Sequence, residues 1–114
     1  MLKDLMQIAN LMRQPARLKE EVDRMQQRVA QVTVEGDAGG GMVKVRANGK
    51  MEILACTLSD EALRLNDREL LEDLIKGAVN QAIEKARKAA AEETLKMATE
   101  LGLPPGMNLP GIGG

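Results

Sequence analysis

The chain has 114 residues, a formal net charge of −1, no histidine and one cysteine, and none of its side chains is aromatic. It therefore lacks the residue most used for acid–base chemistry and for zinc, and it cannot form an intrachain disulfide or a cysteine-based metal cluster. This length fits one domain, and its modest core of Leu, Val, Ala and eight Met favours stabilisation by oligomerisation. We expect a cytoplasmic protein, because a single thiol fits a reducing compartment. Neither a signal peptide nor a membrane span is visible.

The small net charge hides an asymmetry between the two halves of the chain. Residues 1–50 hold nine Lys/Arg against six Asp/Glu, whereas residues 51–114 hold seven against eleven. The first half is therefore the candidate anion-binding part.

The first predicted element is a long helix over residues 2–31. Its apolar side follows the spacing of a heptad seam, interrupted only by a proline. The seam consists of Ile8, Leu11, Pro15, Leu18, Val22, Met25, Val29 and Val32. Pro15 removes a hydrogen bond to Leu11, so we expect it to bend or break the helix into a short arm and a longer one.

Three short strands are predicted next. The first begins at β-branched Val32, a glycine-rich turn follows over 36–41, and residues 42–47 alternate between apolar and basic side chains. Asn48-Gly49 is a strong hairpin signal because both positions tolerate positive φ. The third strand, over 50–58, is apolar on both faces and needs two covering layers, which a helix of the same chain and a partner subunit could supply.

After a one-turn connector over 59–65, a second long helix is predicted over 68–101. Asn66 or Asp67 would cap it, since Asn66 and Glu69 have capping-box spacing, and Gly102 would end it. Each long helix would measure about 45–50 Å, whereas a compact chain of this size has a radius of gyration of about 13 Å. The helices must therefore project or meet a second chain. Residues 103–114, rich in Pro and Gly, would form a flexible tail after the domain at 1–102.

A row of arginines, the arginine ridge, lies nearly opposite the seam on the first helix. It consists of Arg13, Arg17, Arg24 and Arg28. At ~100° per residue the four fall within an arc of about 60°, and each guanidinium can donate two parallel hydrogen bonds to a phosphate. The alternative is a solvated face of i,i+4 ion pairs, such as the one between Glu20 and Arg24.

Lys44, Arg46 and Lys50 form a second basic group around the predicted hairpin. They are further candidates for DNA binding, and the alternative is that they protect an edge strand against aggregation. Without aromatic rings the chain cannot hold single-stranded bases by stacking. A duplex bound through its phosphates, with low or shape-based specificity, is therefore the natural nucleic-acid ligand.

The remaining candidates for chemistry are weak. The glycines at 39–41 lack the Lys-Ser/Thr pair of a phosphate loop, and Cys56 reads as a buried structural thiol in an apolar strand. No nucleophile–base pair or metal constellation can be assembled. We therefore expect no enzymatic activity, no cofactor, no metal and no small-molecule substrate.

Nearly the whole chain resembles the YbaB/EbfC family of small bacterial nucleoid-associated proteins. The resemblance is carried most specifically by residues 72–82 (EDLIKGAVNQA) and 103–111 (LPPGMNLPG), with support from 1–3 (MLK), 11–14 (LMRQ), 39–41 (GGG), 42–45 (MVKV) and 48–50 (NGK). It implies an α+β fold of order α-β-β-β-α, with a long helix at each end and a three-stranded antiparallel sheet between them. It also implies a tweezer-like homodimer that binds duplex DNA in the nucleoid and alters its conformation.

Two residues depart from the pattern that the resemblance implies. Pro15 stands where similar proteins usually have a helix former, and Arg17 stands where Gln is common. The family supplies no invariant DNA-contact motif, so the ridge assignment rests on helix geometry. The alternative function is a structural or chaperone-like module that grips a protein partner with its projecting helices.

Overall fold

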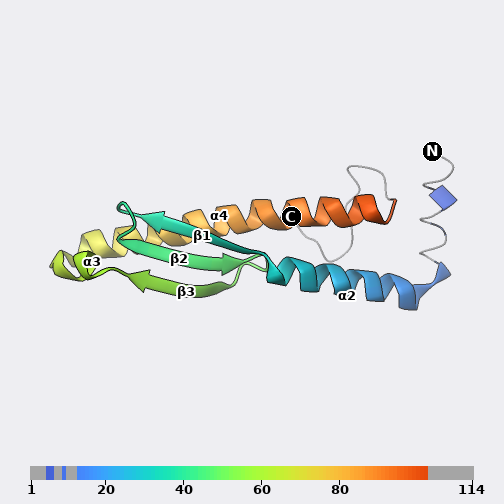
Figure 1. Ribbon diagram of the computed structural model, residues 1–114, viewed down its shortest axis with the longest axis horizontal. Helices are drawn as coiled ribbons and strands as arrows, with labels where there is room; N and C mark the ends of the chain where they lie inside the picture. The colour runs from blue at the N-terminus through green and yellow to red at the C-terminus, as the bar shows by residue number, and fades with distance from the viewer. Residues whose placement is uncertain (1–4, 7–8, 10–12, 103–114) are drawn as a thin grey trace.

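Two long helices flank a three-stranded antiparallel sheet in an elongated molecule that measures 63 × 24 × 17 Å (Figure 1). The computed structural model describes residues 5–6, 9 and 13–102; the predicted tail at 103–114 and the start of the predicted seam lie outside the described residues. The described elements are α2 (Pro15–Gln31), β1 (Thr33–Ala38), β2 (Val43–Asn48), β3 (Ile53–Leu58), α3 (Asp60–Arg64) and α4 (Arg68–Glu100). The radius of gyration is 19.1 Å, so the expectation that the helices project from a small core is confirmed.

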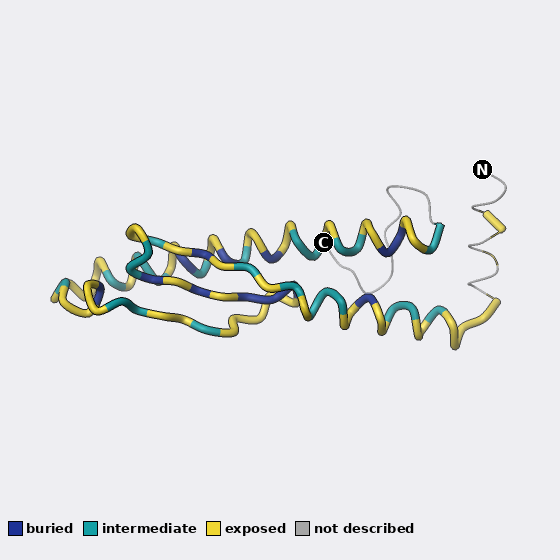
Figure 2. The backbone as a smooth tube through the Cα atoms, in the orientation of Figure 1, coloured by how far each residue is buried: buried dark blue, intermediate teal, exposed yellow. Residues whose placement is uncertain are grey.

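The core lies between the sheet and the first half of α4. The sheet has the order β1-β2-β3, and the inward residues of central β2, Val43, Val45 and Ala47, are fully buried. They pack in one cluster with Ala78, Ala82 and Ala86, which share one face of α4 because they recur every fourth residue. Figure 2 shows these buried positions as dark segments along β2 and α4.

Small residues let the backbones of β1 and α4 approach closely. A Cβ added to Gly36 in β1 would overlap the carbonyl oxygen of Ala78 and would lie 2.5 Å from the backbone nitrogen of Ala82. Only glycine allows this approach. The turn predicted over 36–41 is wrong at its start, because β1 continues to Ala38.

Strand β3 is covered little by residues 5–6, 9 and 13–102. Helix α4 contacts mainly β1 and β2, so Ile53 and Leu54 remain 44% and 47% exposed. The expectation that Cys56 is a buried thiol is wrong, because it is exposed on this edge strand. The described residues of one chain do not supply the two covering layers that the third strand was expected to need.

The β2–β3 turn is organised by a side chain. The oxygen Oδ1 of buried Asn48 accepts hydrogen bonds from the backbone N–H groups of Lys50 (2.9 Å) and Glu52 (3.1 Å). The hairpin signal predicted positive φ at Asn48 and Gly49. This prediction is wrong, because the residue of the turn with positive φ is Met51 (64°). Gly49 is required for another reason: a Cβ there would overlap the carbonyl oxygen of Val29.

The helix ends follow local signals. Gln14 is not helical (φ −122°, ψ 78°), so Pro15 breaks the first predicted helix and starts α2. Asp67 caps α4 by accepting a hydrogen bond from the Leu70 N–H (3.1 Å), whereas Asn66 has a φ of 49°, so the Asn66–Glu69 capping box is wrong. Gly102, with φ 75°, follows the end of α4 as predicted.

Helix α2 runs antiparallel to the second half of α4 and packs against it (Figure 1). The seam residue Met25 is buried, as are Met97 and Ala98 of α4. We call α2 together with residues 89–100 of α4 the arm, and the sheet with α3 and residues 68–88 the body. No helix in the described part of the chain has both the length and the apolar character that crossing a membrane requires.

Candidate nucleic-acid interface

Three members of the arginine ridge are exposed: Arg17 and Arg24 on the arm, and Arg13 just before the start of α2. Arg17 and Arg24 lie seven residues apart in α2, so they share a face and are separated by about 10 Å along the axis. Arg24 is 63% exposed, and its only described ion pair is a 3.3 Å contact with Glu21 one turn before it. Arg13 precedes the break at Gln14, so the helical arc predicted for the ridge does not extend to it.

Arg28, the fourth member of the ridge, is turned into the arm. Its Nη2 lies 2.7 Å from a carboxylate oxygen of Glu93, and its Nη1 lies 2.8 Å from one of Glu100. Nη1 also lies against Met97 Sδ, between the two glutamates along α4. The hydrogen bond to Glu100 raises the pKa of Arg28, aided by the negative charges of both carboxylates and opposed by desolvation.

We call Arg28, Glu93 and Glu100 the Arg28 cluster. It holds one positive and two negative charges. Its net charge is therefore negative, and it attracts an approaching anion less than an exposed arginine does. The sequence carried no signal for it, because the partners of Arg28 are 65 and 72 residues away.

The second basic group does not form a uniform positive surface. Lys44 and Arg46 are exposed on the face of β2 away from α4, but Asp37 and Glu35 of β1 are their direct cross-strand neighbours. Directly opposed residues of this kind have Cβ atoms about 5 Å apart. The alternative of edge protection is wrong for these two residues, because β2 is the central strand.

Lys50 is exposed in the turn after β2, at the junction of body and arm. Its backbone N–H donates to Asn48 Oδ1, which helps to fix the backbone of the turn that carries its side chain. A turn lysine is a mobile point charge, so it offers less geometric selection of phosphate than an arginine on a helix.

Three of the six cations of α4 form ion pairs with acids of the same helix. Arg68 pairs with Glu72 (3.2 Å), Lys76 with Asp73 (3.7 Å) and Arg87 with Glu84 (3.4 Å). Exposed pairs at these spacings contribute little stability. They do neutralise the body part of α4 locally. Within the arm, α2 is the more cationic helix, because its four Lys/Arg face three Asp/Glu, whereas residues 89–100 of α4 hold one Lys against three Glu.

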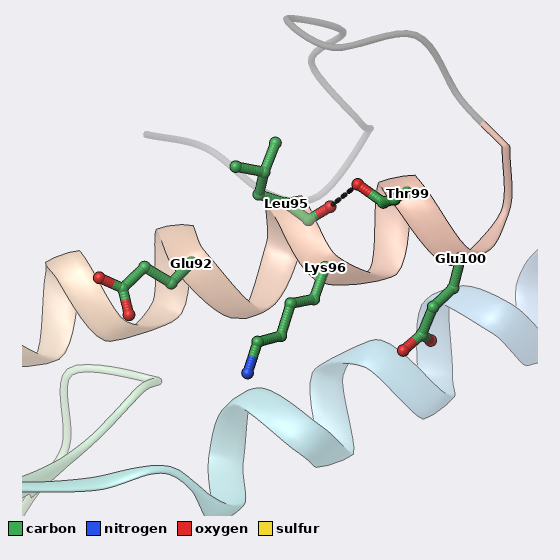
Figure 3. A pocket seen from close by; sticks show the side chains of 5 residues that line it. All are labelled: Glu92, Leu95, Lys96, Thr99 and Glu100. Atoms are coloured by element: carbon green, nitrogen blue, oxygen red, sulfur yellow. Dashed lines mark hydrogen bonds between the residues drawn. The ribbon is translucent and has the colours of Figure 1, made fainter.

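An open pocket of about 530 Å³ lies on the second half of α4 (Figure 3). It is lined by Glu92, Leu95, Lys96, Thr99 and Glu100, and Lys96 extends from α4 toward α2. All five residues are exposed and belong to one helix, so this is a surface hollow without convergent catalytic groups. Across residues 5–6, 9 and 13–102, no group of three His, Cys, Asp or Glu side chains is placed to hold a metal ion.

These features define a class of protein: an elongated α-β-β-β-α scaffold that presents a cationic helix on a projecting arm. The sequence profile of the YbaB/EbfC DNA-binding family matches residues 4–101. The chain belongs to the YbaB/EbfC DNA-binding family, as the resemblance of its motifs indicated.

Curated relatives agree with this assignment, and one solved structure shares the fold. A nucleoid-associated protein of Anaeromyxobacter dehalogenans is 44% identical over 109 residues, which cover 96% of this chain and 100% of the relative. Another, from Methylococcus capsulatus, is 40% identical over 103 residues, 90% of this chain and 95% of the relative. The crystal structure of an uncharacterized protein from Helicobacter pylori matches 72% of this chain and 95% of its own with a TM-score of 0.58; at 22% identity it shows the fold alone.

Proposed function

We propose that this chain is a non-enzymatic, nucleoid-associated protein that binds duplex DNA as a homodimer and alters the conformation of the DNA. The observation that carries the proposal is the exposed face of α2, on which Arg17 and Arg24 point away from the packed seam. The DNA-binding family and the names of the curated relatives support the ligand. The bacterial nucleoid is then the place of action.

The contacts are made mainly to phosphates. Guanidinium groups about 10 Å apart on one helix face can each engage a separate phosphate with paired hydrogen bonds. The absence of aromatic residues removes the stacking platforms that single-stranded ligands need. Lys44 and Arg46 contribute less than the exposed arginines, because Asp37 and Glu35 face the same approaching anion.

The homodimer forms through the uncovered edge of the sheet. The residues involved, the apolar edge, are Ile53 and Leu54 of β3, with Leu63 and Leu70 after it. These side chains are 41% to 62% exposed in one chain, and β3 has unpaired backbone groups as well. A second copy related by a two-fold axis would cover this edge and would present two arms to one duplex.

The dimer can be tested without DNA. We expect the protein to have the mass of a dimer by sedimentation, and the Ile53→Glu/Leu54→Glu variant to shift toward monomer because it places charges in the interface. The Glu61→Gln variant, at an exposed position of α3, is the matched surface change and should remain dimeric. A double variant that stays fully dimeric would reject this interface.

The DNA-binding proposal is tested by measuring the affinity for a duplex over a range of salt concentrations. Each phosphate neutralised contributes about 0.9 to the slope of log K against log salt, so a steep fall in affinity is expected. An affinity independent of salt would contradict phosphate contacts. No duplex binding, together with capture of one stoichiometric protein partner after nuclease treatment, would favour the alternative of a gripping module.

The effect on DNA conformation needs its own readout. Energy transfer between dyes at the two ends of a short duplex should change when the dimer binds, because two arms that engage one duplex favour a bent or stiffened path. Unchanged transfer at saturation would leave the binding proposal standing and would reject the conformational one.

A further inference from the structure

We infer that Arg28 is a positioning residue for DNA binding and not a phosphate contact: its ion pairs with Glu93 and Glu100 hold α2 at a fixed register and rotation on α4. This inference rests on the proposed function, because what it positions are the exposed arginines of the same helix.

The apolar part of the arm is too small to fix this geometry by itself. Met25, Met97 and Ala98 are its buried apolar residues among those described, while Leu18 and Val22 are half-buried. Methionine side chains are flexible and adapt to shifted neighbours. A seam of this kind favours contact between the two helices but allows them to slide and rotate relative to each other.

The Arg28 cluster supplies the constraint on sliding and rotation that the apolar seam lacks. Glu93 and Glu100 lie seven residues apart on α4, about 10 Å along the axis, and Arg28 meets both with separate nitrogen atoms. Sliding α2 in either direction would break one of the two bonds. Rotating α2 would withdraw the planar fork from both carboxylates, so the cluster fixes translation and rotation together.

The same geometry makes Arg28 a poor phosphate contact. Both of its terminal nitrogen atoms already donate to carboxylates, and its side chain is only 35% exposed. A phosphate that approached it would meet two negative charges around one positive charge. By contrast, Arg24 is mostly exposed and has one acidic neighbour, Glu21.

The position of Arg28 on α2 explains how it affects DNA binding. Arg24 lies one turn before it and Arg17 about three turns before it, on the same face of the helix. An error in the rotation of α2 at Arg28 is therefore carried to both side chains. When both arms of a dimer must meet one duplex, such an error reduces simultaneous engagement.

The decisive experiment changes the glutamates and leaves every arginine in place. If Arg28 positions α2, the Glu93→Gln/Glu100→Gln variant should bind a duplex about tenfold more weakly than the wild type, a size common for loss of a coupled polar network. If Arg28 contacts phosphate, the same variant should bind more tightly, because two repelling charges are gone and the guanidinium is released. Tighter binding would overturn the inference.

A matched control separates position from overall charge. The Glu84→Gln/Glu92→Gln variant removes two acids from exposed sites of the same helix, outside the Arg28 cluster. It should bind the duplex as well as or better than the wild type. Equal weakening in both double variants would overturn the inference, because it would show that the effect does not depend on the cluster.

Hydrogen exchange on the free protein gives a readout that does not involve DNA. Amides of α2 should exchange faster in Arg28→Gln and in Arg28→Lys than in the wild type, since a lysine ammonium cannot serve as a fork between two carboxylates. Arg24→Gln should leave α2 exchange unchanged. If wild-type protein fails to bind duplex, the proposed function is rejected, while this exchange difference still tests whether the Arg28 cluster positions α2. If α2 exchange is unchanged in Arg28→Gln, the positioning role of the cluster is itself rejected.

Discussion

The body and the arm are stabilised in different ways, although α4 runs through both. In the body, small side chains bring backbones together: Gly36 lies against Ala78 and Ala82, beside the buried face of strand β2. In the arm, long flexible side chains meet along a single seam, and the Arg28 cluster supplies the ion pairs between the two helices. Packing in the body therefore determines the stability of the fold, whereas contacts in the arm determine where the exposed arginines lie. We propose that these arginines contact DNA.

The largest expected effect is in the body. Gly36→Val would force a branched side chain into the backbone of α4, so we expect a loss of about 3 kcal/mol or more in the free energy of unfolding. Urea denaturation measures it. A variant as stable as the wild type would show that β1 and α4 do not approach each other as described.

Truncation of the seam should have a smaller effect, confined to the arm. Met25→Ala removes the one fully buried side chain of α2, for which we expect a loss of about 2 kcal/mol, near the low end for buried methionine because the arm can relax. Hydrogen exchange should accelerate in α2 and remain unchanged in β2. Acceleration in both regions would show that arm and body unfold as one unit.

The smallest effect should have the opposite sign. Gly77 lies on an exposed face of α4, where a Cβ would make only an ordinary 3.8 Å contact with Ala38. Gly77→Ala should therefore raise the free energy of unfolding by about 0.5–1 kcal/mol through helix propensity. A destabilised Gly77→Ala would mean that α4 lies closer to β1 at this point, and it would weaken the distinction from Gly36.

Features governed by neighbouring residues could be predicted from the sequence. The break at Pro15 and the end of α4 at Gly102 follow from backbone preferences within a few residues, and the cap was narrowed to Asn66 or Asp67, of which Asp67 is the cap. The element order α-β-β-β-α follows from a change in hydrophobic period between helices and strands. The family resemblance gave the same order.

Features governed by distant residues could not be predicted. Exposure of Cys56 depends on which strands α4 covers, and the carboxylates that engage Arg28 come from 65 and 72 residues away. The acidic neighbours of Lys44 and Arg46 depend on the register of β1 with β2. Of the four ridge arginines, Arg17, Arg24 and Arg28 lie on α2, whereas Arg13 precedes the break at Gln14. Spacing alone could not distinguish a guanidinium facing solvent from one held by a second helix.

One measurement tests the division between arm and body most directly: the slope of log K for duplex binding against log salt in two neutralised variants. The arm variant is Arg13→Gln/Arg17→Gln/Arg24→Gln, and the body variant is Lys44→Gln/Arg46→Gln. If the exposed arginines hold phosphates, the arm variant should lower the magnitude of the slope by up to about 2.7 per subunit, at 0.9 per contact, while the body variant changes it little. A slope unchanged in the arm variant and clearly reduced in the body variant would contradict DNA binding by the arm.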